Sequence, residues 1–347
     1  MRDIAFYQEH LDRVSRSFAF CIQKLEPPLR HWVSLSYLLC RVLDTVEDSP
    51  WPPDVAGAAL RDEQFLAFDS FMRTEPTAEA VRRWSARFPA LIPPGEKTLL
   101  EDAPSLFADL HSLPRSAREV IQKAVRQMSQ GMKTYSERAV VEKGGVLRLR
   151  DLTDVNRYCY FVAGVVGELL SRLVIEQNPG FQPPRDFFRN AFHFGLFLQK
   201  VNLLKDQPTD EAEGRFLVPD RQQLLASLSE NAEGSLAYLV SLPIEEKGYR
   251  TFCAWSLFLG AASLSWIERR TKIPRAITQE LLGAIESIVQ DNEALLAGFD
   301  EYFPKLPALS ADREGAHAAL SAVDADWFAR LSSDSLGPAD RAELRMM

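Results

Sequence analysis

The chain is organised around the stretch Arg41-Val42-Leu43-Asp44-Thr45-Val46-Glu47-Asp48, which closes a long apolar run beginning near Trp32. In a helix, Arg41, Asp44 and Asp48 would share one face, because they occupy positions i, i+3 and i+7. Like charges four residues apart destabilise a helix unless solvent or a bound cation offsets their repulsion. The preceding residues are apolar nearly all round, which indicates a buried helix. A carboxylate pair at the end of a buried helix favours a metal site.

The composition is that of an ordinary acidic globular protein. The 347 residues include 40 Lys and Arg against 48 Asp and Glu, giving a formal net charge of -8. This balance provides no basic footprint for nucleic acid, so we expect no nucleic-acid partner. The length allows one or two domains.

The cysteines and histidines form no recognisable metal-binding pattern. Four cysteines are widely spaced in apolar runs with no CxxC pair, as is typical of buried thiols in a reducing compartment. The five histidines show neither HExxH nor HxxxH spacing. Any metal must therefore be bound by oxygen ligands.

No segment is typical of a membrane anchor or an export signal. The N-terminus lacks the uninterrupted apolar core of a signal peptide. The longest uncharged run, residues 251–267, lies at the short end of membrane-spanning length and contains serines and a glycine. We interpret it as a buried core helix, and we expect a cytoplasmic protein.

The hydrophobic pattern predicts an all-α fold. Apolar residues recur at spacings of three and four almost throughout, and no sustained period-two segment occurs. One helix should run from about Leu29 to Asp48 and stop at Ser49-Pro50-Trp51-Pro52-Pro53. Further helices are expected from near Pro114, from a cap at Thr153, and over about Phe187–Asp206.

The last of these helices repeats the polar pattern of the first. Gln199, Asn202 and Asp206 stand at i, i+3 and i+7, and Asp210 extends the line by four. A single such pair is common on solvated helix ends, but two on apolar helices favour a shared metal site. Pro208 should end or kink this helix near residue 207, so that Asp210 would reach a metal from a turn or not at all.

Two facing aspartate pairs suit magnesium and a diphosphate. Mg²⁺ prefers octahedral oxygen coordination and usually takes one or two carboxylates together with water and substrate phosphate oxygens. Ions held in this way stabilise a departing diphosphate. Arg41 and Lys205, beside the carboxylates, would reach the same phosphates. The sequence contains no Walker A or GxGxxG loop that would compete with this interpretation.

Four segments resemble signatures of the squalene and phytoene synthase family. They are Ser15-Arg16-Ser17-Phe18, Asp44-Thr45-Val46-Glu47-Asp48, Tyr158-Cys159-Tyr160-Phe161-Val162-Ala163-Gly164, and Phe194-Gly195-Leu196-Phe197-Leu198-Gln199-Lys200-Val201-Asn202-Leu203-Leu204-Lys205-Asp206. The resemblance keeps order and spacing over roughly residues 12 to 275. Its details are more similar to squalene synthases than to phytoene synthases.

The resemblance implies an isoprenoid synthase fold, a single helical domain around a central active-site cavity. Residues 1–305 would form this domain, and residues 306–347 a C-terminal tail or extra helix of unknown role. The implied enzyme is a Mg²⁺-dependent prenyltransferase that joins two farnesyl diphosphates head to head through presqualene diphosphate, followed by NADPH-dependent reduction to squalene. The apolar product implies peripheral association with the inner face of the membrane for its release, and no protein partner is indicated.

The resemblance also assigns roles by position. In the implied scheme Tyr158 would act in catalysis with Arg41, Asp44 and Asp48, although neighbouring aromatic residues leave a packing role open. The implied metal ligands are Asp44, Glu47, Asp48, Asp206 and Asp210; the substrate-binding residues are Arg16, Ser17, Arg41, Gln199, Asn202, Lys205 and Arg215; and the basic residues for the NADPH phosphate are Arg269, Lys272 and Arg275.

Two other functions stay open at this point. One is a non-reductive family member that makes presqualene diphosphate, dehydrosqualene, hydroxysqualene or phytoene, which the lack of a dinucleotide fingerprint motivates. The other is a catalytically silent scaffold on the same fold, which the two intact carboxylate motifs disfavour.

Overall fold

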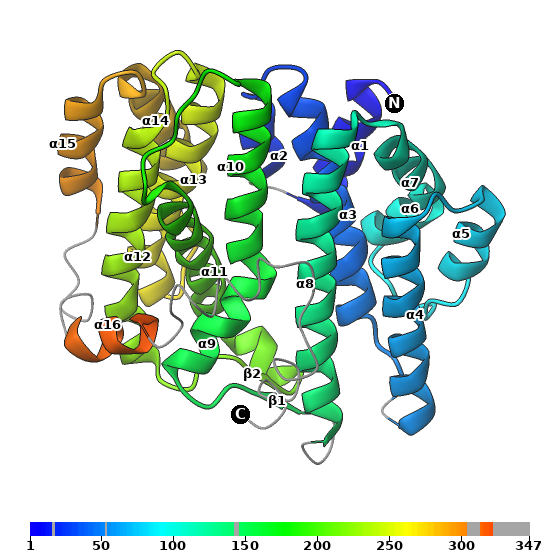
Figure 1. The fold of residues 1–347 in the computed structure, drawn as a ribbon. Coiled ribbons are helices and arrows are strands. Elements are labelled where there is room, and N and C mark those ends of the chain that lie inside the picture. Colours follow the sequence, from blue (N-terminus) through cyan, green and yellow to red (C-terminus); the bar gives the residue numbers. More distant parts are fainter. Residues whose placement is uncertain (16–17, 53, 142–145, 304–312, 322–347) are drawn as a thin grey trace.

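The chain folds into a bundle of helices, drawn in Figure 1 from a computed structural model. The structure describes residues 1–15, 18–52, 54–141, 146–303 and 313–321. In the first part of the chain the helices are α1 (Ile4–Val14), α2 (Phe18–Ile22), α3 (Leu29–Asp48), α4 (Val55–Arg73), α5 (Ala78–Ser85), α6 (Pro94–Glu101), α7 (Ala103–Ser112) and α8 (Arg115–Val141).

The rest of the described chain is also helical apart from two short strands. The strands are β1 (Leu147–Arg148) and β2 (Arg215–Phe216). The helices are α9 (Leu152–Cys159), the π-helical turn η1 (Tyr160–Gly164), α10 (Val165–Gln177), α11 (Phe187–Ala212), α12 (Arg221–Ser241), α13 (Lys247–Glu268), α14 (Arg275–Ile288), α15 (Asn292–Tyr302) and α16 (Arg313–Ser321). The predicted all-α fold is confirmed.

Helices α3, α8, α10 and α11 occupy the middle of the bundle. Figure 1 shows α4 to α7 on its right side and α12 to α15 on its left. Helix α11 packs most extensively against α12, and also against η1, α10 and α13. This arrangement leaves α3 and α11, the two helices with aspartate motifs, on opposite walls of the interior.

Helix α3 has the predicted limits and the predicted burial. Leu35, Leu38 and Leu39 are fully buried, as expected for a helix that is apolar nearly all round. Its carboxyl end is set by Ser49, whose backbone is extended and is followed by Pro50. Asp44, Glu47 and Asp48 therefore lie in the last turns of an uninterrupted helix.

Helix α11 does not end at Pro208, so the prediction that it could end near residue 207 is wrong. The helix continues through Pro208 and Asp210 to Ala212. Proline has no N–H to donate to the carbonyl of Leu204, four residues earlier. Arg221 of α12 places Nη1 3.5 Å from that carbonyl oxygen and thus supplies a substitute donor. Asp206 and Asp210 consequently share one helical face.

The helical segment before α11 begins earlier than predicted. The cap is Asp151 instead of Thr153, because the Asp151 carboxylate accepts a hydrogen bond from the backbone N–H of Asp154 at 2.9 Å. Downstream, a Cβ on Gly167 would lie 2.1 Å from the carbonyl oxygen of Ala191 in α11. This glycine is therefore required for close packing of α10 on α11.

The two strands hold the chain beyond α11 in place. β1 and β2 pair in parallel, with Leu147 opposite Arg215. Arg138 of α8 supports β1, because its Nη2 donates to the carbonyl of Arg148 while its guanidinium binds both carboxylate oxygens of Asp154, at 2.9 and 2.7 Å. The pairing fixes Arg215 just beyond the second aspartate motif.

The C-terminal helix α16 packs on the bundle. It contacts α9 and α12, where Asn156 Nδ2 donates to the carbonyl of Ala319 at 3.2 Å. The division at residue 305 stays a prediction, and residues 304–312 and 322–347 lie outside the described residues.

One stretch, Leu152–Gln177, is long and apolar enough to cross a membrane. Length and composition alone are weak evidence for a span, and 56% of its apolar window is buried inside the protein, as in a core helix. The uncharged run at residues 251–267 lies within α13, where Phe252, Trp255 and Leu257 are buried. Its interpretation as a core helix is confirmed.

Candidate active site

A cavity of about 680 Å³ opens between α3 and α11. This volume is in the range of sites that hold small molecules. Met128 and Met132 of α8, Val166 and Leu170 of α10, and Phe194 of α11 contribute to an apolar interior. The carboxylates of both aspartate motifs also line the cavity, so it has a charged region and an apolar region.

The first motif is held by an ion-pair network centred on Arg41. Arg41 Nη1 donates to Asp44 Oδ2 at 2.9 Å, and Nη2 donates to Glu96 Oε1 of α6 at 2.8 Å. Burial raises the pKa of Asp44 to about 6, and the nearby charges of Asp48 and Glu96 add to the shift, whereas Arg41 opposes it. A cation beside Asp44 would favour its charged form.

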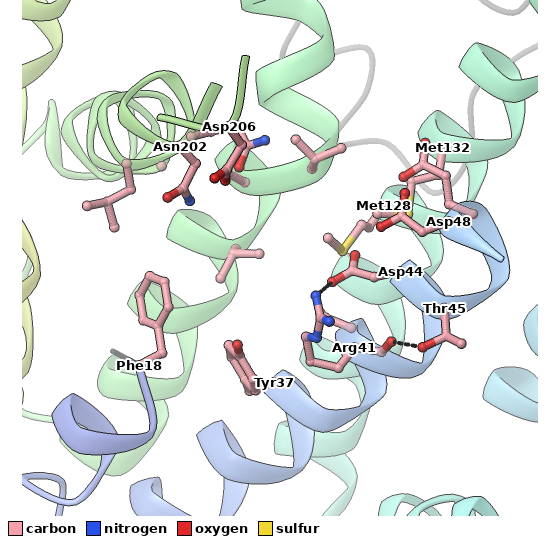
Figure 2. A pocket seen from close by; sticks show the side chains of 18 of the residues that line it. Phe18, Tyr37, Arg41, Asp44, Thr45, Asp48, Met128, Met132, Asn202 and Asp206 are labelled. Atoms are coloured by element: carbon pink, nitrogen blue, oxygen red, sulfur yellow. Dashed lines mark hydrogen bonds and ion pairs between the residues drawn. The ribbon is translucent and has the colours of Figure 1, made fainter. Parts of the chain in front are cut away.

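The second motif lies on the facing helix. Asn202 and Asp206 of α11 face Asp44 and Asp48 of α3 in Figure 2. The Asp206 side chain is 51% exposed, whereas that of Asp210 is 9% exposed. Asp210 is thus the buried member of the pair.

Arg215 bridges the two motifs. It donates to Asp210 Oδ1 through Nη2 at 2.7 Å, and its Nη1 contacts Asp48. Burial raises the pKa of Asp210. The negative charge of Asp206 adds to this shift, whereas the positive charge of Arg215 opposes it. The guanidinium neutralises carboxylates from both walls of the cavity.

The donor set fits magnesium bound with a substrate. Within the part of the chain that the structure describes, no three Asp, Glu, His or Cys side chains gather closely enough to hold a metal by themselves. Mg²⁺ does not require such a cage, because it takes one or two carboxylates and completes its shell with water and phosphate oxygens. The open, oxygen-only mouth offers this kind of coordination, which is absent from the apolar interior.

Tyr158 lines the cavity next to the carboxylates. Its ring is buried and packs edge-on against Tyr135, with ring centroids 5.1 Å apart. Burial raises its pKa well above the usual value and the nearby charge of Glu47 adds to the shift, so the phenol stays protonated. Glu47 also lines the cavity, and burial together with Asp48 and Asp44 raises its pKa well above normal.

The other predicted substrate-binding residues differ in how they relate to the cavity. Gln199, Asn202 and Arg215 line the cavity. Lys205 is not part of the lining, but its Nζ lies 3.1 Å from Asn202 Oδ1 and 3.2 Å from Asp206 Oδ2. It therefore stands at the outer edge of the second motif. Arg16 and Ser17 lie outside the described residues.

The basic segment expected to bind NADPH is not brought to the cavity. Arg269, Lys272 and Arg275 are exposed and lie around the junction of α13 and α14. The guanidinium of Arg269 lies over the ring of Trp266 at 5.8 Å, and none of the three residues lines the cavity. The described structure thus gives no geometric support to the predicted NADPH contacts.

Tyr37 and Glu96 are among the polar residues at the site that sequence reasoning missed. Tyr37 lines the cavity one helical turn before Arg41, and Glu96 binds Arg41 from another helix. The position of Tyr37 on the Arg41 face of α3 was a usable signal. No local sequence pattern indicates Glu96, because its contact with Arg41 joins residues that are 55 positions apart.

Residues 11–232 match the model of the squalene/phytoene synthase family. The chain belongs to this family. It is similar to the squalene synthase of Eremothecium gossypii, with 34% identity over 60% of this chain and 44% of that protein. The squalene synthase ERG9 of Saccharomyces cerevisiae is 28% identical over 75% of this chain and 60% of its own length. The chain thus spans about half the length of these curated relatives.

Two solved structures share the fold. TcSQS with the ligand BPH1237 superimposes with a TM-score of 0.70 at 22% identity, covering 96% of this chain and 99% of that one. A dehydrosqualene synthase in complex with a ligand gives a TM-score of 0.55 at 17% identity, covering 83% and 96%. The isoprenoid synthase architecture expected from the sequence is therefore confirmed.

Proposed function

We propose that this protein is a squalene synthase, a farnesyl-diphosphate farnesyltransferase that joins two farnesyl diphosphates head to head. The observation that carries the proposal is the pair of aspartate motifs that face each other across the mouth of an apolar cavity. A prenyl diphosphate has the same division, with a charged head and a long hydrocarbon tail. The relatives named squalene synthase support this assignment.

In this proposal the mouth binds the diphosphates. Asp44 and Asp48 on α3, with Glu47 in support, and Asp206 and Asp210 on α11 would hold Mg²⁺. The bound ions would neutralise the departing diphosphate. Arg41, Arg215 and Lys205, together with Arg16 and Ser17, would contact the phosphates. Gln199 and Asn202 would orient the substrate from the same wall.

The apolar interior would protect the reacting carbons. Loss of diphosphate from one substrate leaves an allylic cation, which the double bond of the second substrate captures with loss of a proton, giving the cyclopropyl product presqualene diphosphate. Val166, Leu170 and Phe194 would enclose the chains and exclude water from that cation. Tyr158, a protonated phenol between cavity and carboxylates, would donate a hydrogen bond to the leaving diphosphate.

Reduction to squalene requires a hydride, which NADPH supplies when bound. Because Arg269, Lys272 and Arg275 do not line the cavity, we assign no step to them. The same observation favours the second candidate, a family member that releases presqualene diphosphate, dehydrosqualene, hydroxysqualene or phytoene without reduction. Cytoplasmic localisation with peripheral membrane contact for product release is part of the proposal.

Incubation with farnesyl diphosphate tests the proposal. We expect purified protein with Mg²⁺ and NADPH to form squalene, identified by mass spectrometry, and to stop at presqualene diphosphate or a dehydrogenated product without NADPH. A product that NADPH does not change would support the non-reductive candidate. No conversion under any condition would contradict both enzyme assignments and support a scaffold.

A further inference from the structure

Arg41 is shared between two carboxylates that come from different helices. Asp44 lies one turn away on α3 and accepts from Nη1 at 2.9 Å. Glu96 lies in the first turn of α6 and accepts from Nη2 at 2.8 Å. The Arg41 Nε is buried and has no hydrogen-bond partner among the residues that the structure describes. The guanidinium therefore depends on its two terminal nitrogens for its orientation.

The proposed function places competing demands on Asp44. A metal ion bound to this carboxylate would repel the guanidinium and weaken its contact with Asp44. The Arg41 side chain is only 27% exposed, so losing its partner would leave a largely desolvated cation unpaired. Among the described residues, the other ion-pair partner of Arg41 is Glu96, whose side chain is 16% exposed.

We infer that Glu96 is a positioning residue that retains Arg41 at the cavity wall when Asp44 turns from Arg41 to a metal ion. This inference rests on the proposed function. With Glu96 in place, Arg41 keeps a carboxylate partner in both states of Asp44, so metal binding need not break its last ion pair. Arg41 then stays oriented toward the diphosphate.

The same contact joins a second part of the wall to α3. Leu91, Ile92 and Pro93 line the cavity directly before α6 begins at Pro94. Leu91 is exposed, whereas Ile92 packs against the hydrophobic core. Glu96, in the first turn of α6, thus ties this segment to the helix that carries the first motif.

A double-mutant cycle separates this role from a simple charge effect. The full chain and its Glu96→Gln, Arg41→Gln and double variants are titrated with Mn²⁺ in the presence of inorganic diphosphate, and free Mn²⁺ is measured by electron paramagnetic resonance. Glu101→Gln, an exposed position on the same helix, is the matched control. Circular dichroism and thermal unfolding verify that each variant is folded.

We expect Glu96→Gln to weaken Mn²⁺ binding on the order of tenfold, because Arg41 then competes for Asp44. The same substitution should change binding little in the Arg41→Gln background, and Glu101→Gln should have no effect. Equal losses in both backgrounds would show that Glu96 acts through its charge alone and would overturn the inference. A wild-type chain that takes up no Mn²⁺ would also overturn it.

A crystal structure with Mn²⁺ and diphosphate provides a readout that does not depend on variants. The inference requires the Arg41–Glu96 contact to be kept and the Arg41–Asp44 contact to be broken. An intact Arg41–Asp44 pair beside bound metal would contradict it. Neither measurement uses farnesyl diphosphate, so a failure to turn over that substrate would count against the proposed function and leave this test valid.

Discussion

Arg215 donates a hydrogen bond to Asp210 through Nη2 at 2.7 Å, and the same guanidinium contacts Asp48 on the facing wall. A single cation thus neutralises the innermost carboxylate of one motif and the last carboxylate of the other. Burial raises the pKa of Asp210 and the charge of Asp48 adds to this shift, so without Arg215 the two carboxylates would repel each other across the mouth. Arg215 holds the two walls together before any metal is present.

Substitution of Arg215 should therefore affect stability and metal response together. We expect Arg215→Gln to lower the Tm without Mg²⁺ and to show a larger Tm increase on Mg²⁺ addition than wild type, because the ions take over the neutralisation. Turnover should fall on the order of tenfold to a hundredfold. Arg185→Gln, at an exposed arginine outside the cavity lining, is the control and should leave the Tm and its response to Mg²⁺ nearly unchanged. An unaltered Mg²⁺ response of Arg215→Gln would contradict the bridging role.

The aspartate motifs should be equally important to turnover. We expect Asp44→Asn and Asp206→Asn each to reduce Mg²⁺-dependent turnover by on the order of a hundredfold or more, since each removes ligand charge at nearly constant volume. Steady-state kinetics at varied Mg²⁺ measures the loss, and circular dichroism tests that the fold is kept. Full activity of either variant would argue against the metal assignment.

Asp210→Asn is expected to behave like these two variants. The helix carries Asp210 on the same face as Asp206, because α11 continues through Pro208. An Asp210→Asn enzyme with wild-type turnover and an unchanged Mg²⁺ midpoint would show that Asp210 serves Arg215 alone.

Acid should destabilise the protein through His193. Burial lowers its pKa to about 4, and the positive charges of Arg189 and Lys200 contribute. Between about pH 6.5 and 4 the unfolded chain therefore binds a proton that the folded chain does not, so the free energy of unfolding falls as the pH falls. The loss from this group should reach roughly 2 kcal/mol between pH 7.5 and 5.

Urea unfolding of His193→Gln at both pH values measures this contribution. The variant should lose less stability on acidification than wild type, whereas His317→Gln, an exposed histidine, should lose as much as wild type. Equal pH dependence in His193→Gln and wild type would rule out His193 as the source.

Arg250 should be a strong determinant of stability away from the site. Its fully buried guanidinium donates to the carbonyls of Val289, Leu242 and Leu239 at 2.8, 2.7 and 3.1 Å, and to Asn292 Oδ1 at 2.6 Å. Arg250→Met leaves these acceptors without donors and should cost about 3 kcal/mol or more. Thermal and urea unfolding measure the change, with the exposed Arg185→Met as control. A loss below that of Arg185→Met would contradict the expectation.

The sequence predicted those parts of the site that depend on spacing within one helix. Asp44 and Asp48 followed from an apolar run with a proline stop, and Asn202 and Asp206 from the repeat of that pattern. Contacts between helices were not predictable in this way. Glu96 reaches Arg41 from another helix, and Arg215 reaches two motifs that are far apart in sequence.

Local rules failed where a tertiary contact replaced a local one. Pro208 breaks a helix on propensity alone, but Arg221 supplies a donor from α12 to the carbonyl that Pro208 cannot serve. The NADPH role of the basic segment 269–275 came from charge and resemblance and stays a prediction, because neither determines on which side of the bundle the α13–α14 junction lies.

The substitute donor at Pro208 has a mechanical consequence. Arg221 also binds Gln207 at 2.8 Å through Nη1 and Glu268, the last residue of α13, at 2.5 Å through Nη2. The Arg221 side chain therefore contacts the final turns of both α11 and α13. A displacement of the end of α13 would move the same guanidinium that completes the turn before Asp210, so this side chain links the end of α13 to the second aspartate motif.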